Sequence, residues 1–162
     1  RACLEQGDDR AQEGALRIVI GSDHAGFALK EEIRQALVAE GHEVEDFGVH
    51  NLERVDYPDI ALRVARAVAA GEHERAILIC GTGIGVSITA NKVRGIRAAV
   101  CTDCYMARMA REHNNAQILC MGGRVVGPGS ALEIVHAFLE SEFLGGRHAT
   151  RVEKIAAADA AR

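Results

Sequence analysis

The chain has 162 residues, of which 48% are apolar and 26% charged, and its formal net charge is −4. This length fits one domain around one hydrophobic core. The charge balance lacks the basic footprint of a nucleic-acid-binding protein, and aromatic residues, at only 4%, are too few for base-stacking platforms. No apolar run reaches the roughly 18 residues that a membrane span needs. We therefore expect neither nucleic acid nor a membrane as a partner.

Residues 1–16 form a polar segment of mixed charge ahead of the first apolar run. The segment has no apolar stretch of the kind that marks a secretory signal. We expect a poorly ordered N-terminal extension over 1–16, followed by a single domain over 17–162 that ends in a helical tail.

The chain contains five cysteines. An odd number in a chain that is not a short secreted scaffold argues against a disulfide framework, and reduced thiols fit a cytoplasmic protein. Cys101 and Cys104 have the spacing of a redox or zinc pair, but no second pair stands at a metal-like distance. We expect these two thiols to contribute to packing, with a thiol redox module, in which diamide would oxidise the pair, as an alternative.

From Arg17 onward, short apolar runs alternate with amphipathic segments. Apolar residues are spaced as in a strand in some segments and as in a helix in others. Glycine or proline marks several of the helix ends. In chain order, the pattern predicts a strand at 17–21, a helix at 27–40, a strand at 42–47, a helix at 58–71, a strand at 75–80, a helix from the next turn to about 93, a strand at 96–101, a helix at 103–113, a strand at 116–121, a helix at 130–143, and a short Ala-rich helix after 145–146.

Five strands separated by helices predict an α/β fold with a five-stranded parallel sheet covered on both faces, a Rossmann-like α/β/α structure of three layers. Such a fold does not define an activity, but its ligands bind beyond the carboxyl ends of the strands. Polar and reactive residues follow three of the predicted strands and the fourth helix, and we expect them to gather at one edge of the sheet. They occupy 21–26, 80–85, 113–115 and 122–124.

Cys80 is the sharpest candidate for chemistry. It closes an apolar strand just before a helix N-terminus, where unpaired N–H groups and the helix dipole favour negative charge. A thiol in this position can be held as a thiolate and serve as a general base. Gly81, Gly83 and Gly85 allow the backbone to approach a phosphate or an oxyanion closely. The turn lacks the Gly-Lys-Ser/Thr ending of a nucleotide P-loop, so a nucleotide-binding sensor, which ATP would stabilise, is the alternative.

Other candidates have plausible structural roles as well as functional ones. Asp23 and His24 follow the first strand and could form a turn and helix cap. His113 ends a charged helix, where a histidine can simply complement the helix dipole. Arg147 and Arg151 share one face if the tail is helical, and two guanidiniums suit a phosphate dianion, although a solvated face has the same pattern.

Together these motifs resemble the type B ribose-5-phosphate isomerase family, which includes allose- and galactose-6-phosphate isomerases. The resemblance covers about 17–155. It rests on Gly-Ser-Asp-His-Ala-Gly at 21–26, Asp-Tyr-Pro at 56–58, Ile-Cys-Gly-Thr-Gly-Ile-Gly at 79–85, Ala-Asn-Lys at 90–92, His-Asn at 113–114, Gly-Arg-Val-Val-Gly at 123–127 and Gly-Gly-Arg-His at 145–148. It implies interconversion of ribose 5-phosphate and ribulose 5-phosphate through a cis-enediol, with no cofactor. No metal is expected either, since no ligand cluster stands near the motifs.

The resemblance also implies roles for individual residues. Cys80 moves a proton between neighbouring sugar carbons, Thr82 helps to orient the thiolate, and backbone N–H groups at 81–85 stabilise the enediolate oxygen. His113 opens the furanose ring. The implied contacts are Asp23 and Asn114 to sugar hydroxyls, His24, Arg147 and Arg151 to the phosphate, Arg124 as a further contact, and Tyr57 in the pocket wall.

Members of this family form dimers or dimers of dimers with sites at the subunit interface. The resemblance therefore implies that His113 and the tail arginines serve a site built partly by another copy. One branch of the family places a glutamate base directly after the last glycine of the turn. Here that position is Val86, which cannot accept a proton, so Cys80 is the remaining base. A six-carbon sugar 6-phosphate stays open as an alternative substrate.

Overall fold

The computed structural model describes residues 14–162. The predicted N-terminal extension therefore lies outside the described residues except for 14–16, and so does Cys3. In chain order the elements are β1 (Arg17–Ser22), the 3₁₀ helix η2 (His24–Gly26), α1 (Phe27–Ala39), β2 (Glu43–Asp46), α2 (Tyr57–Ala69), β3 (Arg75–Cys80), α3 (Ile84–Ala90), β4 (Ala98–Val100), α4 (Cys104–Glu112), β5 (Ile118–Gly122), α5 (Pro128–Glu140) and α6 (Arg147–Ala160).

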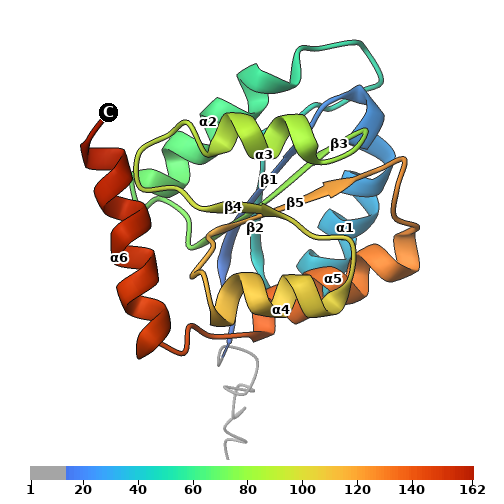
Figure 1. Cartoon of the computed structure of the whole chain (residues 1–162). Helices are drawn as coiled ribbons and strands as arrows, with labels where there is room; N and C mark the ends of the chain where they lie inside the picture. Colours follow the sequence, from blue (N-terminus) through green and yellow to red (C-terminus); the bar gives the residue numbers. More distant parts are fainter. Residues whose placement is uncertain (1–13) are drawn as a thin grey trace, which may run out of the picture.

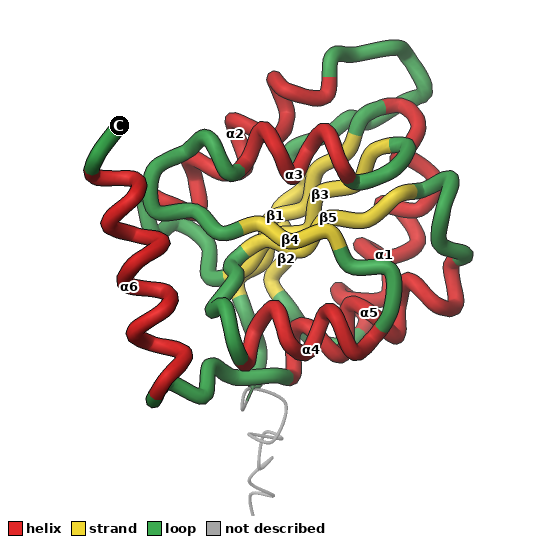
Figure 2. Tube along the Cα trace, viewed as in Figure 1, coloured by secondary structure: helices red, strands yellow, loops and turns green. Residues whose placement is uncertain are grey.

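The five strands form one parallel sheet in the order β2-β1-β3-β5-β4 (Figures 1 and 2). The predicted Rossmann-like fold is thereby confirmed. From β1 the chain passes to β2 on one side, and from β2 it returns to β3 on the other. The point between β1 and β3, where the strand order reverses, is where folds of this kind hold their ligands.

Helices cover both faces of the sheet. Buried side chains of α1, α4 and α5 pack against one face, and those of α2 and α3 pack against the other. In Figure 1 these two layers lie below and above the strands, and α6 lies apart from both at one side. Of the α6 side chains, only His148 is buried. Within residues 14–162, no helix combines the length and the apolar character that crossing a bilayer requires.

Two elements near the site are shorter than the pattern predicts. β4 covers only three of the expected positions, because this edge strand pairs with β5 alone. α3 ends at Ala90 rather than near 93. The side chain of the next residue, Asn91, makes hydrogen bonds to the main chain of Ala98, the first residue of β4. The Asn91 amide donates to the Ala98 carbonyl at 2.9 Å, and the Ala98 N–H donates back to Asn91 at 2.9 Å.

α5 begins before and ends before its predicted bounds of 130–143. Proline is favoured in the first turn of a helix, because it has no N–H to lose there, so Pro128 starts the element. At the other end Ser141 is extended, and its hydroxyl donates to the Ala137 carbonyl at 2.6 Å, which satisfies a terminal acceptor.

A buried charge ties α1 to the end of β2. Lys30 is fully buried, and its ammonium group contacts Asp46 at 2.5 Å and Glu31 at 2.9 Å. Hydrogen bonds from Arg34 and then Lys30 lower the pKa of Glu31 to about 2. Asp46 also accepts from the Gly48 N–H at 2.8 Å. This network fixes the loop after β2 beside the end of β1.

Candidate active site

β3 brings Cys80 to the switch point of the sheet. Cys80 is 4% exposed. It pairs with Gly122 of β5, and the residue before it, Ile79, pairs with Ser22 of β1. The Gly83 N–H donates to the Cys80 sulfur at 3.1 Å. A negative charge on this sulfur would therefore meet a backbone donor that is already in place.

Gly83 holds that donor in position through its backbone conformation. Its φ is +80°, and a Cβ atom at this position would lie 2.8 Å from the main-chain carbon of Met121. Only glycine combines this φ with so close an approach. The Gly83 N–H is therefore directed at the sulfur by a turn that no other residue type could form without distortion.

The Thr82 hydroxyl makes a hydrogen bond within its own turn. The hydroxyl accepts a hydrogen bond from the Ile84 N–H at 3.2 Å, and the residue is exposed. In the described part of the chain, the hydrogen bond to the Cys80 sulfur comes from Gly83 and not from Thr82. A hydrogen bond to the hydroxyl from the N–H two residues on is a pattern that threonine commonly forms in turns.

Two predicted residues from other elements reach the same turn. The Arg124 guanidinium lies over Gly81, where a Cβ atom would be 3.5 Å from its Nη1. The Tyr57 ring, at the start of α2, lies over Gly85, where a Cβ atom would be 2.4 Å from the ring. The absence of side chains at Gly81 and Gly85 leaves room for both.

Asp23 acts as a helix cap at the end of β1. Its Oδ1 accepts from the N–H groups of Ala25 at 3.0 Å and Gly26 at 3.1 Å, and its own N–H donates to the Ile79 carbonyl at 3.2 Å. The predicted turn and cap are thus present. His24 follows, and its Nδ1 is buried without a hydrogen-bond partner among the described residues.

Glycines let the loops after β1, β3 and β5 touch backbone to backbone. A Cβ atom at Gly26 would lie 2.6 Å from the Ile79 carbonyl oxygen, and one at Gly123 would lie 2.8 Å from the Ala25 carbonyl oxygen. One at Gly122 would lie 2.7 Å from main-chain atoms of the β3 loop. The three loops therefore form one closely packed platform around Cys80.

The prediction that all candidate residues gather at one edge is wrong for His113 and Asn114. Helix α4 starts beyond the carboxyl end of β4 and runs back antiparallel to the strands, so its last residues lie at the amino edge. The Asn114 carbonyl accepts from Arg97, which directly precedes β4. Sequence reasoning assigned His113 to a helix end correctly, but that end faces the opposite side of the sheet from Cys80.

The predicted helix in the tail is confirmed, and it starts at the same amino edge. Arg147 and Arg151 are both exposed one turn apart on α6. Between them, His148 stacks on His113 with ring centroids 4.0 Å apart and planes 10° apart. Burial, and then the charges of His113 and the two arginines, lower the pKa of His148. The stacked pair joins α6 to the end of α4.

Three residues at this edge were missed by sequence reasoning. His148 contacts His113 directly, while Arg97 and Arg111 donate to the Asn114–Ala116 segment. Asn115 has a φ of +48°, a conformation that asparagine tolerates better than most residues. The asparagine pair directly after a helical pattern was the one available signal for this left-handed helix end.

The remaining described cysteines are free thiols. Burial, and then the charge of Asp103, raise the pKa of Cys101 to about 12, and burial raises the pKa of Cys120 well above its usual value. Such thiols are poor nucleophiles at neutral pH. No group of three or more His, Cys, Asp or Glu side chains within residues 14–162 is arranged to hold a metal ion.

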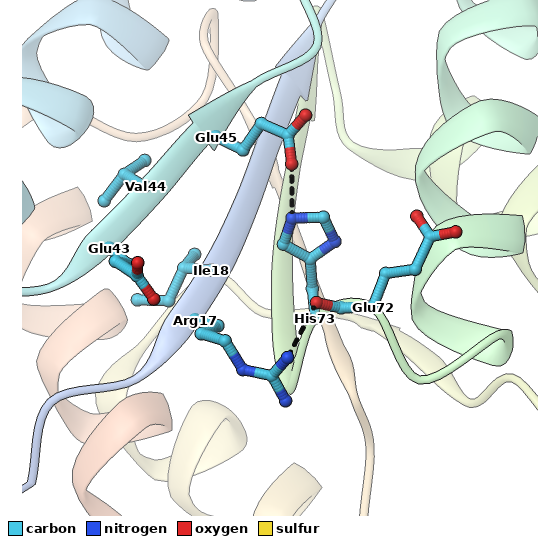
Figure 3. Close-up of a pocket in the computed structure, with 7 residues that line it drawn as sticks. All are labelled: Arg17, Ile18, Glu43, Val44, Glu45, Glu72 and His73. Atoms are coloured by element: carbon cyan, nitrogen blue, oxygen red, sulfur yellow. Dashed lines mark hydrogen bonds and ion pairs between the residues drawn. The ribbon is translucent and has the colours of Figure 1, made fainter.

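A separate pocket of about 350 Å³ opens at the amino ends of β1 and β2 (Figure 3). Its polar groups are largely engaged with one another: His73 contacts Glu45 at 2.7 Å, and Arg17 donates to the Glu72 carbonyl at 3.3 Å. None of the predicted site residues lines it. The pocket is therefore distinct from the candidate site around Cys80.

Comparison with known proteins identifies the family of this chain. The model of a family described as Ribose/Galactose Isomerase matches residues 18–155. The chain belongs to this family. The sequence-based expectation of an isomerase of this family is confirmed.

Individual members of the family are similar over nearly their whole length. The ribose-5-phosphate isomerase B of Escherichia coli K12 is 51% identical over 90% of this chain and 98% of its own. A D-erythrulose-4-phosphate isomerase of Pectobacterium atrosepticum is 50% identical over 86% and 93%. The solved structure of Clostridium thermocellum ribose-5-phosphate isomerase B is 61% identical, covers 89% of this chain and 97% of its own, and superposes with a TM-score of 0.88.

Proposed function

We propose that this family member interconverts D-ribose 5-phosphate and D-ribulose 5-phosphate through a cis-enediol, with Cys80 as the base. The observation that carries the proposal is the 3.1 Å hydrogen bond from the Gly83 N–H to the Cys80 sulfur at the switch point. A backbone donor aimed at the sulfur is in place to bond a negative charge that forms there. The name of the Escherichia coli relative supports the five-carbon substrate.

In this mechanism the Cys80 thiolate removes the proton from C2 of the open-chain aldose. The electron pair forms the C1–C2 double bond, and negative charge develops on the oxygen of C1. Free backbone N–H groups of the turn from Gly81 to Gly85 stabilise that oxygen, a contribution typically worth about 3 kcal/mol per donor. The oxygen of C1 then takes up a proton and the C2 hydroxyl releases one, so that a proton passes from O2 to O1 with no net change. The thiol returns its proton to C1, which gives the ketose and regenerates the thiolate.

The residues at the amino edge complete the site from a second copy. Within one chain, His113 and Arg147 lie at the opposite edge of the sheet from Cys80, so one copy brings only part of the predicted set together. We propose a homodimer, or a dimer of dimers, in which these residues face the Cys80 edge of the neighbour. α3 supports this assembly, because Ile84 and Ile88 are 54% and 57% exposed one helical turn apart.

The remaining predicted residues take the roles that the resemblance implies. His113 moves the proton that opens the furanose ring, and the sugar hydroxyls and the phosphate are held by side chains from both edges. The free Nδ1 of His24 is a buried group with hydrogen-bonding capacity to spare. The proposed contacts are Asp23 and Asn114 for the hydroxyls, His24, Arg147, Arg151 and Arg124 for the phosphate, and Tyr57 for the pocket wall.

Cys80→Ser tests the base. We expect kcat for ribose 5-phosphate to fall at least about 1000-fold, because a neutral hydroxyl replaces the thiolate, while the phosphate contacts keep KM within a few-fold. Solvent deuterium should no longer enter C1 of ribulose 5-phosphate. The matched control is Cys104→Ser, a half-buried thiol outside the site, which should retain activity. Near-normal turnover by Cys80→Ser would remove Cys80 from the mechanism.

Subunit mixing tests the shared site. Cys80→Ser and His113→Ala are each expected to be inactive alone. After the two are mixed and allowed to exchange subunits, half of the dimers are hybrid, and each hybrid has one intact site. About a quarter of wild-type activity should return. No recovery, under conditions in which labelled subunits demonstrably exchange, would mean that His113 does not serve a neighbour's site.

Substrate preference is tested by varying the number of carbons in the sugar phosphate. The Pectobacterium atrosepticum relative acts, by its name, on a four-carbon sugar phosphate, and a six-carbon 6-phosphate is the other alternative. A coupled assay of erythrulose 4-phosphate, ribose 5-phosphate and allose 6-phosphate should give the highest kcat/KM for the pentose. A thiolate base also requires reducing conditions, consistent with the proposed cytoplasmic location.

A further inference from the structure

Arg97 binds the main chain at the end of α4. Its Nε donates to the carbonyl oxygens of Asn114 at 3.0 Å and Asn115 at 3.2 Å, and its Nη2 donates to Asn115 at 2.9 Å. A guanidinium is planar, and its donors have fixed directions. One side chain therefore sets the orientation of two successive carbonyl groups, directly after His113.

Arg97 is itself rigidly placed. Its N–H donates to the Gln117 side chain at 2.8 Å, and its carbonyl accepts from the Gln117 N–H at 3.0 Å. No ion pair in the described part of the chain includes Arg97, so its charge is directed to main-chain carbonyls. Burial lowers the pKa of Arg97.

His113 and Asn114 depend on this backbone contact for their position. Within residues 14–162, neither side chain makes a hydrogen bond to the protein, and His113 is held only by the stack on His148 and by its N–H to the Met109 carbonyl at 2.9 Å. Polar groups left unbonded in this way are available to a substrate. Their placement is decided by the main chain that Arg97 fixes.

We propose that Arg97 is a positioning residue, which holds the main chain of Asn114 and Asn115, directly after His113, so that the side chains of His113 and Asn114 meet the sugar in the ring-opening step. The alternative is that Arg97 only caps the C-terminus of α4, as cations commonly do. A cap would affect folding, but it would not affect one chemical step more than another. The inference rests on the proposed function.

The two sugar phosphates allow that distinction. Ribose 5-phosphate is a furanose in which O4 is bonded to C1, so it must be opened before C2 can lose its proton. In ribulose 5-phosphate the carbonyl is at C2 and O5 carries the phosphate, so no five-membered ring forms. Exchange of its C1 hydrogen with deuterated water requires only that Cys80 removes a proton, equilibrates with solvent and returns a deuteron.

Arg97→Gln is the test variant. At saturating substrate, we expect isomerisation of ribose 5-phosphate to fall about 10- to 100-fold, the size of effect that misplacing a group by about 1 Å can have. Deuterium exchange into ribulose 5-phosphate, followed by NMR, should stay within about threefold of wild type. Retained exchange in the same sample also demonstrates that the variant is folded.

Two further variants complete the experiment. Arg75→Gln is the matched control, because Arg75 is also half-buried with a pKa lowered by burial, but its Nη1 donates to the Glu74 carbonyl at 2.7 Å instead. It should alter neither rate. Arg97→Lys keeps the charge without the planar fork and should give the same selective loss at smaller size. If Arg97→Gln does not fold, Arg97→Lys carries the test.

Equal losses of isomerisation and exchange in the Arg97 variants would overturn the proposal, and so would unchanged rates. Retention of both rates by Cys80→Ser would instead contradict Cys80 as the base, which separates a failure of this inference from a failure of the proposed function.

Discussion

At the carboxyl edge of the sheet, the loops around Cys80 are held by backbone that touches backbone, through glycines such as Gly26 and Gly83. At the amino edge, the segment after α4 is held by long charged side chains, through Arg97 and Arg111. The carboxyl edge depends on glycines, which have no Cβ atom and so let the main chains approach closely. The amino edge depends on hydrogen bonds that arginine side chains donate. The two edges should therefore respond to opposite kinds of change: added atoms at one, lost hydrogen bonds at the other.

The largest effect is expected from Gly83→Ala. The new methyl group would lie 2.8 Å from the Met121 main chain at a φ of +80°, so overpacking adds to left-handed strain, and we expect a loss of about 3 kcal/mol in the free energy of unfolding. Urea denaturation measures it. Gly95→Ala is the control: its φ is +84° with nothing within 4 Å, and only the strain of about 1 kcal/mol should remain. Equal losses would contradict the packing argument.

Arg111→Met should have the next largest effect. Arg111 is 3% exposed, and its Nη1 donates to the Asn115 side chain at 3.0 Å and the Ala116 carbonyl at 2.7 Å. Removing it leaves two acceptors unpaired, at a cost of about 2 kcal/mol in the free energy of unfolding. The exposed Arg66→Met is the control.

The same position can also reverse the expectation. Burial, and then the charges of Arg75 and Arg97, lower the pKa of Arg111 to about 10. If repulsion among the three guanidiniums outweighs the two hydrogen bonds, Arg111→Met will be stabilising. That result would mean that repulsion among buried charges, and not hydrogen bonding, dominates the amino edge.

Acid should weaken the amino edge selectively. Because the pKa of His148 is lowered from 6.5, the unfolded chain binds the proton more readily than the folded chain. The stability linked to His148 is thus complete above about pH 6.5 and is lost as the pH falls below it. We expect Tm to drop by a few degrees between pH 7 and pH 5. His148→Phe keeps a ring on His113 without the titration and should remove that part of the drop.

The smallest effect is expected at the other end of α6. Asp159 accepts from the Gly95 N–H at 2.9 Å and from Arg162 at 2.6 Å, and these hydrogen bonds lower its pKa below 3.8. The carboxylate thus stays ionised through mildly acid pH. Asp159→Asn should leave Tm nearly unchanged and speed amide hydrogen exchange only near the end of α6. A global change in exchange would mean that this contact stabilises the whole domain.

The sequence predicted most of the fold because short apolar runs, which form the strands, alternate with amphipathic segments, which form the helices. β3 has its predicted bounds, and the Cys80 turn lies where a strand end should place it. The prediction was wrong for His113 because it placed the end of a crossover helix at the carboxyl edge, whereas in a parallel sheet such a helix runs back and ends at the amino edge. Contacts such as Gly83 on the sulfur, or Arg97 on Asn114, join residues through backbone atoms, and backbone atoms carry no sequence signal.

The glycine platform also has a consequence for how the enzyme can diversify. Directed evolution works by exchanging side chains, and the innermost layer around Cys80 has none to exchange at Gly26, Gly83 or Gly122. Libraries randomised at these positions should yield almost no active variants other than glycine. Variants with altered substrate preference should instead come from the outer ring of residues that lean on the platform, of which Tyr57 and Arg124 are the nearest examples.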